Sequence, residues 1–72
     1  MNIKQLEAFV RIVKNKSFSQ TAKELYLTQP TVSSYISSLE EDLGVQLFNR
    51  TTKEVHTTNE GEQIYLLSLI HI

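Results

Sequence analysis

The sequence predicts a small, mainly α-helical domain in which three packed helices are followed by a short β-hairpin and the start of a fourth helix. Apolar residues recur at helical spacing in three successive segments, and capping residues stand at the ends of those segments. Two short β-branched runs then separate the third helix from the fourth. The chain of 72 residues is long enough for one domain.

The first two helices are expected over residues 3–14 and 18–26. The apolar stripe of the first consists of Ile3, Leu6, Val10 and Val13. Asn2 is a suitable N-cap for this helix, and Asn15 is the expected stop residue. Ser17, followed three residues later by a glutamine, predicts the N-cap of the second helix.

The third helix is expected over residues 29–43. Thr28 is a good N-cap, Pro30 falls in the first turn, where a missing N–H costs little, and Gly44 ends the helix. Its buried stripe is expected to be Val32, Ile36, Leu39 and Leu43.

The runs 45–48 and 55–58 predict a β-hairpin, although the polar residues between them contain no strong turn signal. The fourth helix should begin near Asn59, with Thr57 or Thr58 as its cap. We therefore expect a domain over residues 1–58 and the start of a further helix over residues 59–72.

Composition excludes several classes of protein. A chain of this size buries only about 60% of its unfolded surface, and its core supplies roughly 3–5 kcal/mol, so a partner subunit is the expected support. The absence of cysteine removes thiolate metal sites and fits a reducing compartment. The charged N-terminus is unlike a signal peptide, and the apolar run 64–72 is too short to span a membrane. A cytoplasmic protein is expected.

Tyr26 to Thr28 separate the second and third helices by three residues, which is the spacing of a helix-turn-helix. The outer side of the third helix should then carry five hydroxyls and no charge before Glu40; they belong to Thr31, Ser33, Ser34, Ser37 and Ser38. Such a face can enter a major groove without repulsion and hydrogen-bond to base edges. From the residues alone, base reading and an ordinary solvated helix are equally favoured.

The net charge of −1 argues against binding polyanions by bulk charge, so any phosphate contacts depend on where the cations lie. In the expected fold, five cations flank the hydroxyl face: Lys14, Lys16, Lys23, Arg50 and Lys53. For Tyr35, a position at the edge of the core and a contact with DNA are about equally favoured.

The run from Ser17 to Ser33 resembles the N-terminal winged helix-turn-helix of LysR-type transcriptional regulators. The resemblance extends over about residues 2–65 without gaps and includes Leu39-Glu40, Leu43-Gly44 and Leu47-Phe48-Asn49-Arg50. It implies a homodimer on double-stranded DNA, joined through the fourth helix, with the third helix in the major groove and the wing near the minor groove. Family members usually continue into a further domain that senses a small-molecule co-inducer, which would lie outside these 72 residues.

The resemblance also assigns roles to individual positions. The set that would read bases is Gln29, Pro30, Thr31, Ser33, Ser34 and Tyr35. The set that would contact the DNA backbone is Ser17, Ser19, Lys23, Thr28, Ser37, Ser38, Arg50 and Lys53. Within the second set, Arg50 is expected at the base of the wing and Lys53 at its tip.

The sequence departs from the family pattern in the reading helix and in the tail. Ser34 and Tyr35 replace the more usual basic or amide residues, which makes the reading face unusually neutral. Residues 66–72 are apolar nearly all round, as expected of a dimerisation helix that is cut short or of a tail foreign to the full-length protein.

Two other classes of function, a protein–protein assembly module and an enzyme, are alternatives to DNA binding. A winged helix used for protein–protein assembly would keep the same core but has no need of a neutral hydroxyl face. An enzyme is disfavoured, because His56 and His71 are isolated and no nucleophile or phosphate-loop motif occurs. No cofactor or metal is expected.

Overall fold

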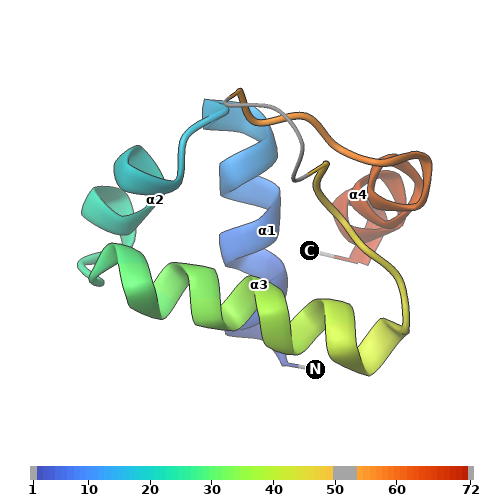
Figure 1. Ribbon diagram of the computed structural model, residues 1–72, viewed down its shortest axis with the longest axis horizontal. Helices are drawn as coiled ribbons and strands as arrows, with labels where there is room; N and C mark the ends of the chain where they lie inside the picture. The colour runs from blue at the N-terminus through green and yellow to red at the C-terminus, as the bar shows by residue number, and fades with distance from the viewer. Residues whose placement is uncertain (1, 50–53, 72) are drawn as a thin grey trace.

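The computed structural model describes residues 2–49 and 54–71, which form the helices α1 (Ile3–Asn15), α2 (Phe18–Leu25), α3 (Gln29–Leu43) and α4 (Asn59–His71). Helix α1 stands at the centre and contacts each of the others, with α2 and α4 on opposite sides and α3 crossing its N-terminal half (Figure 1). The mainly helical fold class and the order of the helices are confirmed. None of the helices in the described residues is long and apolar enough to cross a membrane.

The helices begin at the residues whose side chains can cap them. The three expected N-caps accept backbone N–H groups three residues further on: Asn2 from Gln5 at 2.9 Å, Ser17 from Gln20 at 3.1 Å and Thr28 from Thr31 at 3.3 Å. For α4, Thr58 rather than Thr57 accepts from the first turn, with the Gly61 N–H at 2.9 Å from its Oγ1. The starts of the helices therefore follow from local hydrogen bonding.

The end of α1 differs in detail from the expectation. Asn15 remains helical, and Lys16 takes the left-handed conformation, with φ of 55°. The Asn15 amide is engaged elsewhere, since its Nδ2 donates to Thr21 Oγ1 at 3.3 Å and to Glu24 Oε1 at 3.1 Å. The predicted left-handed stop at Gly44 is confirmed, with φ of 71°.

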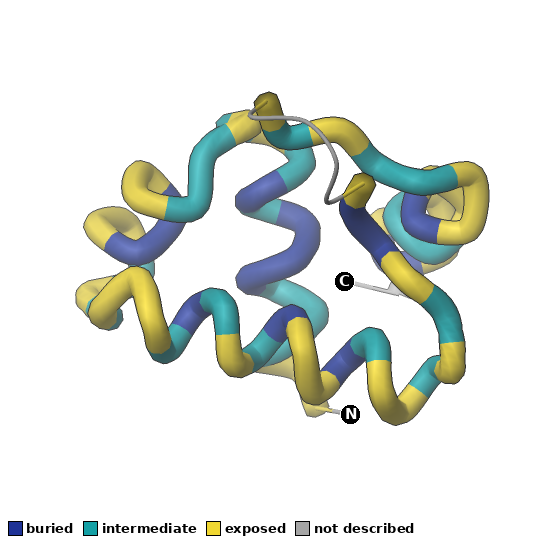
Figure 2. The backbone as a smooth tube through the Cα atoms, in the orientation of Figure 1, coloured by how far each residue is buried: buried dark blue, intermediate teal, exposed yellow. Residues whose placement is uncertain are grey.

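The core lies between α1, α3 and the segment that follows α3 (Figure 2). Its fully buried large residues include Phe9, Ile12, Ile36, Leu39 and Leu47. Three aromatic rings pack edge to face, with centroids of Phe9 and Phe48 5.5 Å apart and those of Phe18 and Phe48 5.6 Å apart. Each fully buried apolar side chain contributes about 1.5–3 kcal/mol, so these rings tie the segment after α3 firmly to α1 and α2.

The expected β-hairpin is not formed as two strands in the described residues. One antiparallel bridge joins Phe48 to Thr57, flanked by hydrogen bonds from Asn49 N to His56 O at 2.8 Å and from Thr58 N to Leu47 O at 3.0 Å. Residues 50–53, where the tip of the wing was predicted, lie outside the described residues. On the α4 side of this bridge, the Leu47 N–H donates to Glu40 and the Thr58 carbonyl accepts from Glu62, so these two groups do not extend the ladder.

Candidate nucleic-acid interface

The α2–turn–α3 unit is held together by backbone hydrogen bonds in the turn and by a small residue buried between the helices. Tyr26 ends α2 in the left-handed conformation, with φ of 57°, and the Leu27 N–H donates to the Ala22 carbonyl at 2.9 Å. Ala22 is almost fully buried between the helices, as its small side chain predicts. Thr28 then caps the start of α3 directly after this three-residue turn.

The outer face of α3 is polar and uncharged along its first two and a half turns. The exposed members of the predicted DNA-contacting set on this helix and its cap are Thr28, Gln29, Pro30, Ser34, Ser37 and Ser38. Thr31 and Ser33 are half-buried on the two flanks of the same face. Thr31 Oγ1 also lies 2.8 Å from Thr28 Oγ1, so part of its hydrogen-bonding capacity is used at the helix start.

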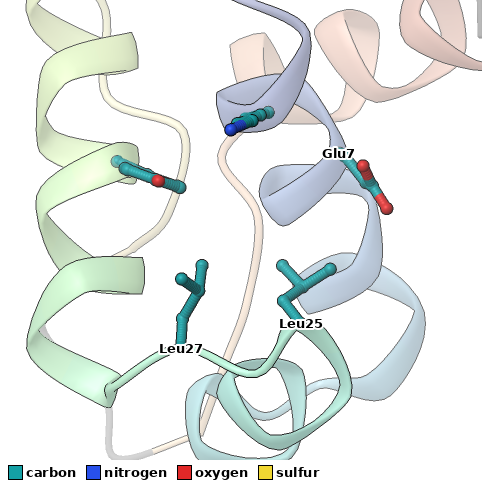
Figure 3. A pocket seen from close by; sticks show the side chains of 5 residues that line it. Glu7, Leu25 and Leu27 are labelled. Carbon is teal, nitrogen blue, oxygen red and sulfur yellow. The ribbon is translucent and has the colours of Figure 1, made fainter.

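Tyr35 lies away from this outer face. It lines a hollow of about 200 Å³ together with Lys4, Glu7, Leu25 and Leu27. Figure 3 shows Leu25 and Leu27 pointing into the space between α1 and α3, with Glu7 at its edge. Tyr35 is thus half-buried beside a surface hollow and away from the exposed hydroxyls, which disfavours a base contact.

The predicted backbone-contacting residues of α2 lie at both of its ends. Ser17 caps the helix and is half-buried, and its Oγ lies 3.2 Å from that of the exposed Ser19. Lys23 is exposed in the last turn. Arg50 and Lys53 lie outside the described residues, so the structure places neither of them.

A polar network that joins α1 to α2 went unnoticed in the sequence. The carboxylate of Glu24 accepts hydrogen bonds from Asn15 Nδ2 at 3.1 Å, from Gln20 Nε2 at 3.4 Å and from Arg11 Nη1 at 3.0 Å. These bonds, with that from Asn15 first, lower the pKa of Glu24. Arg11 also pairs with Glu7 at 3.4 Å, so five side chains of α1 and α2 brace one side of the helix-turn-helix.

Glu40 forms a long-range hydrogen bond and is less exposed than the two acidic residues that follow it. Its neighbours Glu41 and Asp42 are exposed, but Glu40 is half-buried and its Oε2 accepts the Leu47 N–H at 2.7 Å. The spacing of seven residues across a glycine turn carries no local signal for this bond. In the described residues, no group of three or more histidine or acidic side chains could hold a metal ion.

Comparison with known proteins identifies the fold. The family model of the bacterial regulatory helix-turn-helix proteins of the LysR family matches residues 3–62. The chain belongs to the LysR family. This LysR domain superposes on the DNA-binding domain of BenM in its complex with benA site 1 DNA with a TM-score of 0.94 and 38% identity, covering 99% of this chain and 80% of that one.

Curated relatives agree with this assignment. The LysR domain is 42% identical over 64 residues to the HTH-type transcriptional regulator CrgA of Neisseria meningitidis and 42% identical over 65 residues to BenM of Acinetobacter baylyi. The two matches cover 89% and 90% of this chain but only 21% of each relative, so the chain spans about a fifth of the length of these relatives. DarR of Vibrio fischeri in complex with DNA matches with a TM-score of 0.90 and 34% identity, covering 99% of this chain and 25% of that one.

The family resemblance and the helix-turn-helix fold are therefore confirmed: the chain is a LysR-type helix-turn-helix DNA-binding domain. Its named relatives are transcriptional regulators, and nothing in the comparisons supports the assembly-module alternative. The roles of individual residues remain predictions, to which the geometry adds exposure and orientation.

Proposed function

We propose that the LysR domain binds double-stranded DNA sequence-specifically as one half of a homodimer, with α3 in the major groove. The observation that supports it most directly is the uncharged, hydroxyl-lined outer face of α3 in a fold shared with DNA-bound BenM. Hydroxyls and the Gln29 amide can both donate to and accept from base edges. The exposed Lys23 and the hydroxyls around the start of α2 supply backbone contacts.

Base reading is best assigned to the residues exposed at the N-terminal half of α3, namely Gln29, Pro30 and Ser34, with Ser33 at their flank. Thr31 and Tyr35 stand on the opposite flank, where Tyr35 lines the hollow beside α1. Residues 1–58 form the DNA-binding unit, and residues 59–72 begin the helix that carries the partner. Arg50 and Lys53 add phosphate contacts by their place in the family motif.

Each chain contributes few cations to this interface, so its affinity should depend on the partner and on salt. Every phosphate contact adds about −0.9 to the slope of log affinity against log salt. A single chain covers one half-site and should bind weakly, while a linked pair should bind tightly. Tight binding by a proven monomer would contradict the dimeric proposal.

The test is a selection from random duplex DNA with the domain joined as a pair, followed by binding of single-residue variants. Ser34→Ala should relax the preference at one base position with a modest loss of affinity. Lys23→Ala should weaken binding to all sequences and lower the salt slope by about one for each chain that carries it. A pair that shows no sequence preference at low salt would overturn the proposal.

The proposal also covers what the whole protein does. The curated relatives are much longer, and the full-length BenM structure matches this chain over 23% of its length. We propose that the remainder of the protein, as in the family, responds to a small-molecule co-inducer. We also propose that the DNA-binding part is not an enzyme. The protein would work in the cytoplasm, where the DNA is. Binding of the pair to DNA without hydrolysis or modification of the duplex tests the part assigned to this chain.

A further inference from the structure

Five residues from three parts of the chain meet around one buried leucine. Glu40 lies in the last turns of α3, Gln46 and Leu47 follow α3, and Thr58 and Gly61 lie at the start of α4. We call this set the Leu47 junction. Its members are joined by hydrogen bonds and by one close backbone approach.

The hydrogen bonds run from α3 to α4 through the backbone of residues 46 and 47. Glu40 Oε2 accepts the Leu47 N–H at 2.7 Å, and the Leu47 carbonyl accepts the Thr58 N–H at 3.0 Å. The Thr58 hydroxyl donates to the Gln46 carbonyl and accepts the Gly61 N–H at 2.9 Å. The N–H and the carbonyl of Leu47 are thus both hydrogen-bonded, the N–H to Glu40 of α3 and the carbonyl to Thr58 at the start of α4.

Gly61 brings α4 against Leu47 more closely than any other residue would allow. A Cβ on Gly61 would lie 2.2 Å from the Leu47 carbonyl oxygen, and both residues are buried. The bond from Glu40 is charge-assisted and half-buried, which makes it one of the stronger hydrogen bonds of the domain. The junction is therefore a tight and directional connection.

In the described part of the chain, the backbones of α3 and α4 stay apart, with no Cα of one within 8 Å of a Cα of the other. Helix α4 is held at its N-terminus by the Leu47 junction and further along by its packing on α1 and the core, through Ile64 and Tyr65. The Tyr65 ring meets that of Phe9 with centroids 6.5 Å apart. Of these two, only the junction connects α4 to α3 through hydrogen bonds. The angle between the two helices then depends on the hydrogen bonds that Glu40 and Thr58 make to residues 46 and 47.

We propose that Glu40 and Thr58 are positioning residues that set the half-site spacing that the dimer selects. This inference rests on the proposed function, in which α3 reads the half-site and α4 carries the partner. In a symmetric dimer, a small rotation of α3 against α4 is doubled between the two reading helices, so it changes the separation of the half-sites that fit. Neither residue needs to touch DNA for this role.

The test uses the chain with a flexible Gly-Ser segment and one cysteine added after Ile72, which gives a single disulfide because the chain has no cysteine of its own. Duplexes carry two copies of the preferred half-site separated by a series of spacer lengths, and one duplex carries a single half-site. Affinity is measured for each. The unmodified pair should favour one or two spacers.

Two variants break the junction and two preserve it. Glu40→Ala removes the acceptor of the Leu47 N–H, whereas Glu40→Gln retains an oxygen that can accept it. Thr58→Val removes the hydroxyl bonds, whereas Thr58→Ser retains them. Glu41→Ala is the matched control, because this residue is exposed next to Glu40.

Glu40→Ala and Thr58→Val should flatten the spacer preference by about tenfold, because the junction bond that resists the rotation is worth that factor or more. Their affinity for the single half-site should change by less than about threefold, and Glu40→Gln, Thr58→Ser and Glu41→Ala should keep the original profile. An unchanged profile in both breaking variants, or an equal loss on single and paired half-sites, would overturn the inference. If the unmodified pair binds no duplex, the proposed function fails first and the spacing role with it.

A readout without DNA tests the junction by itself. Spin labels on cysteines introduced at the exposed Ser38 of α3 and Gln63 of α4 report the distance between these helices. Folding of every variant is checked by circular dichroism. The distance distribution should broaden or shift in Glu40→Ala and in Thr58→Val but not in Glu41→Ala, and a distribution that stays the same in the folded breaking variants would contradict the positioning role even if DNA binding is normal.

Discussion

Tyr26 holds a backbone conformation that disfavours every residue except glycine, asparagine and aspartate. Its φ is 57°, and the residue is 95% exposed, so packing of the side chain does little to offset the cost of this conformation. An L-residue in this region costs about 1–2 kcal/mol, which glycine avoids. The strain lies in the turn that presents α3.

Tyr26→Gly should therefore stabilise the domain by about 1 kcal/mol, which for a domain of this size raises the melting temperature by roughly 4–8 °C. Tyr26→Ala is the control, because it removes the ring but keeps the Cβ and so keeps the strain. Thermal unfolding followed by circular dichroism measures both. Equal melting temperatures for the two variants would show that the backbone conformation is not the cause.

Gly61 and Gly44 need to be glycine for different reasons. Gly61→Ala should destabilise the domain by about 1–3 kcal/mol, because the new methyl group meets the Leu47 backbone at 2.2 Å. Gly44→Ala should cost about 1 kcal/mol through its φ of 71° alone, since nothing lies within 4 Å of the added Cβ. Urea unfolding gives the two free energies, and a shifted Leu47 amide resonance in Gly61→Ala but not in Gly44→Ala would separate the mechanisms.

At the scale of the elements, α2 is a helix of only eight residues and depends on its neighbours. Such a short helix is unstable alone. Its buried side carries Thr21 and Ala22, and its outer edge is fastened to α1 by Glu24. Because α2 sets the start of α3, the Glu24 network helps to fix the position of the reading helix.

The network gives α2 a dependence on pH with a definite sign. The pKa of Glu24 is lowered in the folded state, so its ionised form contributes stability that is present above the ordinary glutamate pKa and is lost as the pH falls through the lowered value. Glu24→Gln should be less stable than the parent at neutral pH, and the difference should vanish in strong acid, where both side chains are neutral. Urea midpoints of the two proteins across that range measure it, and a difference independent of pH would contradict the role of charge.

At the scale of the whole molecule, the domain combines a small core with a large exposed apolar surface on α4. Leu66, Leu67, Leu69 and Ile70 are all exposed, and Ser68 between them is buried, with its hydroxyl bonded to the Ile64 carbonyl. Exposed apolar patches of this kind mark sites of association. A partner on α4 would supply the stability that a short chain lacks.

Leu67→Lys should weaken self-association of the chain by about tenfold or more, because it places a charge in an apolar interface. Tyr26→Lys is the control, since this position is also exposed but lies in the turn at the far side of the molecule. Sedimentation equilibrium measures both. If the two variants associate equally, α4 is not the contact between chains.

Most of the secondary structure follows from residues close together in the sequence. The caps Asn2, Ser17 and Thr28 bond to groups three residues away, and the stop at Gly44 follows from a backbone preference, so their effects are local. The outer hydroxyl face of α3 follows from the spacing of its buried residues in the same way. In the described residues, the expected hairpin is limited to one bridge, because the Leu47 N–H bonds to Glu40 instead of extending the ladder.

The order of side chains along the chain was thus enough to specify the helices, their N-caps, the family and the uncharged outer face of α3. Only the folded structure assigned Tyr35 to a hollow beside α1, joined Glu24 to Arg11 across 13 residues, and brought Glu40, Leu47 and Gly61 together. The physical reason is distance along the chain: periodicity and capping act within one or two turns, whereas these contacts exist only after the helices have packed.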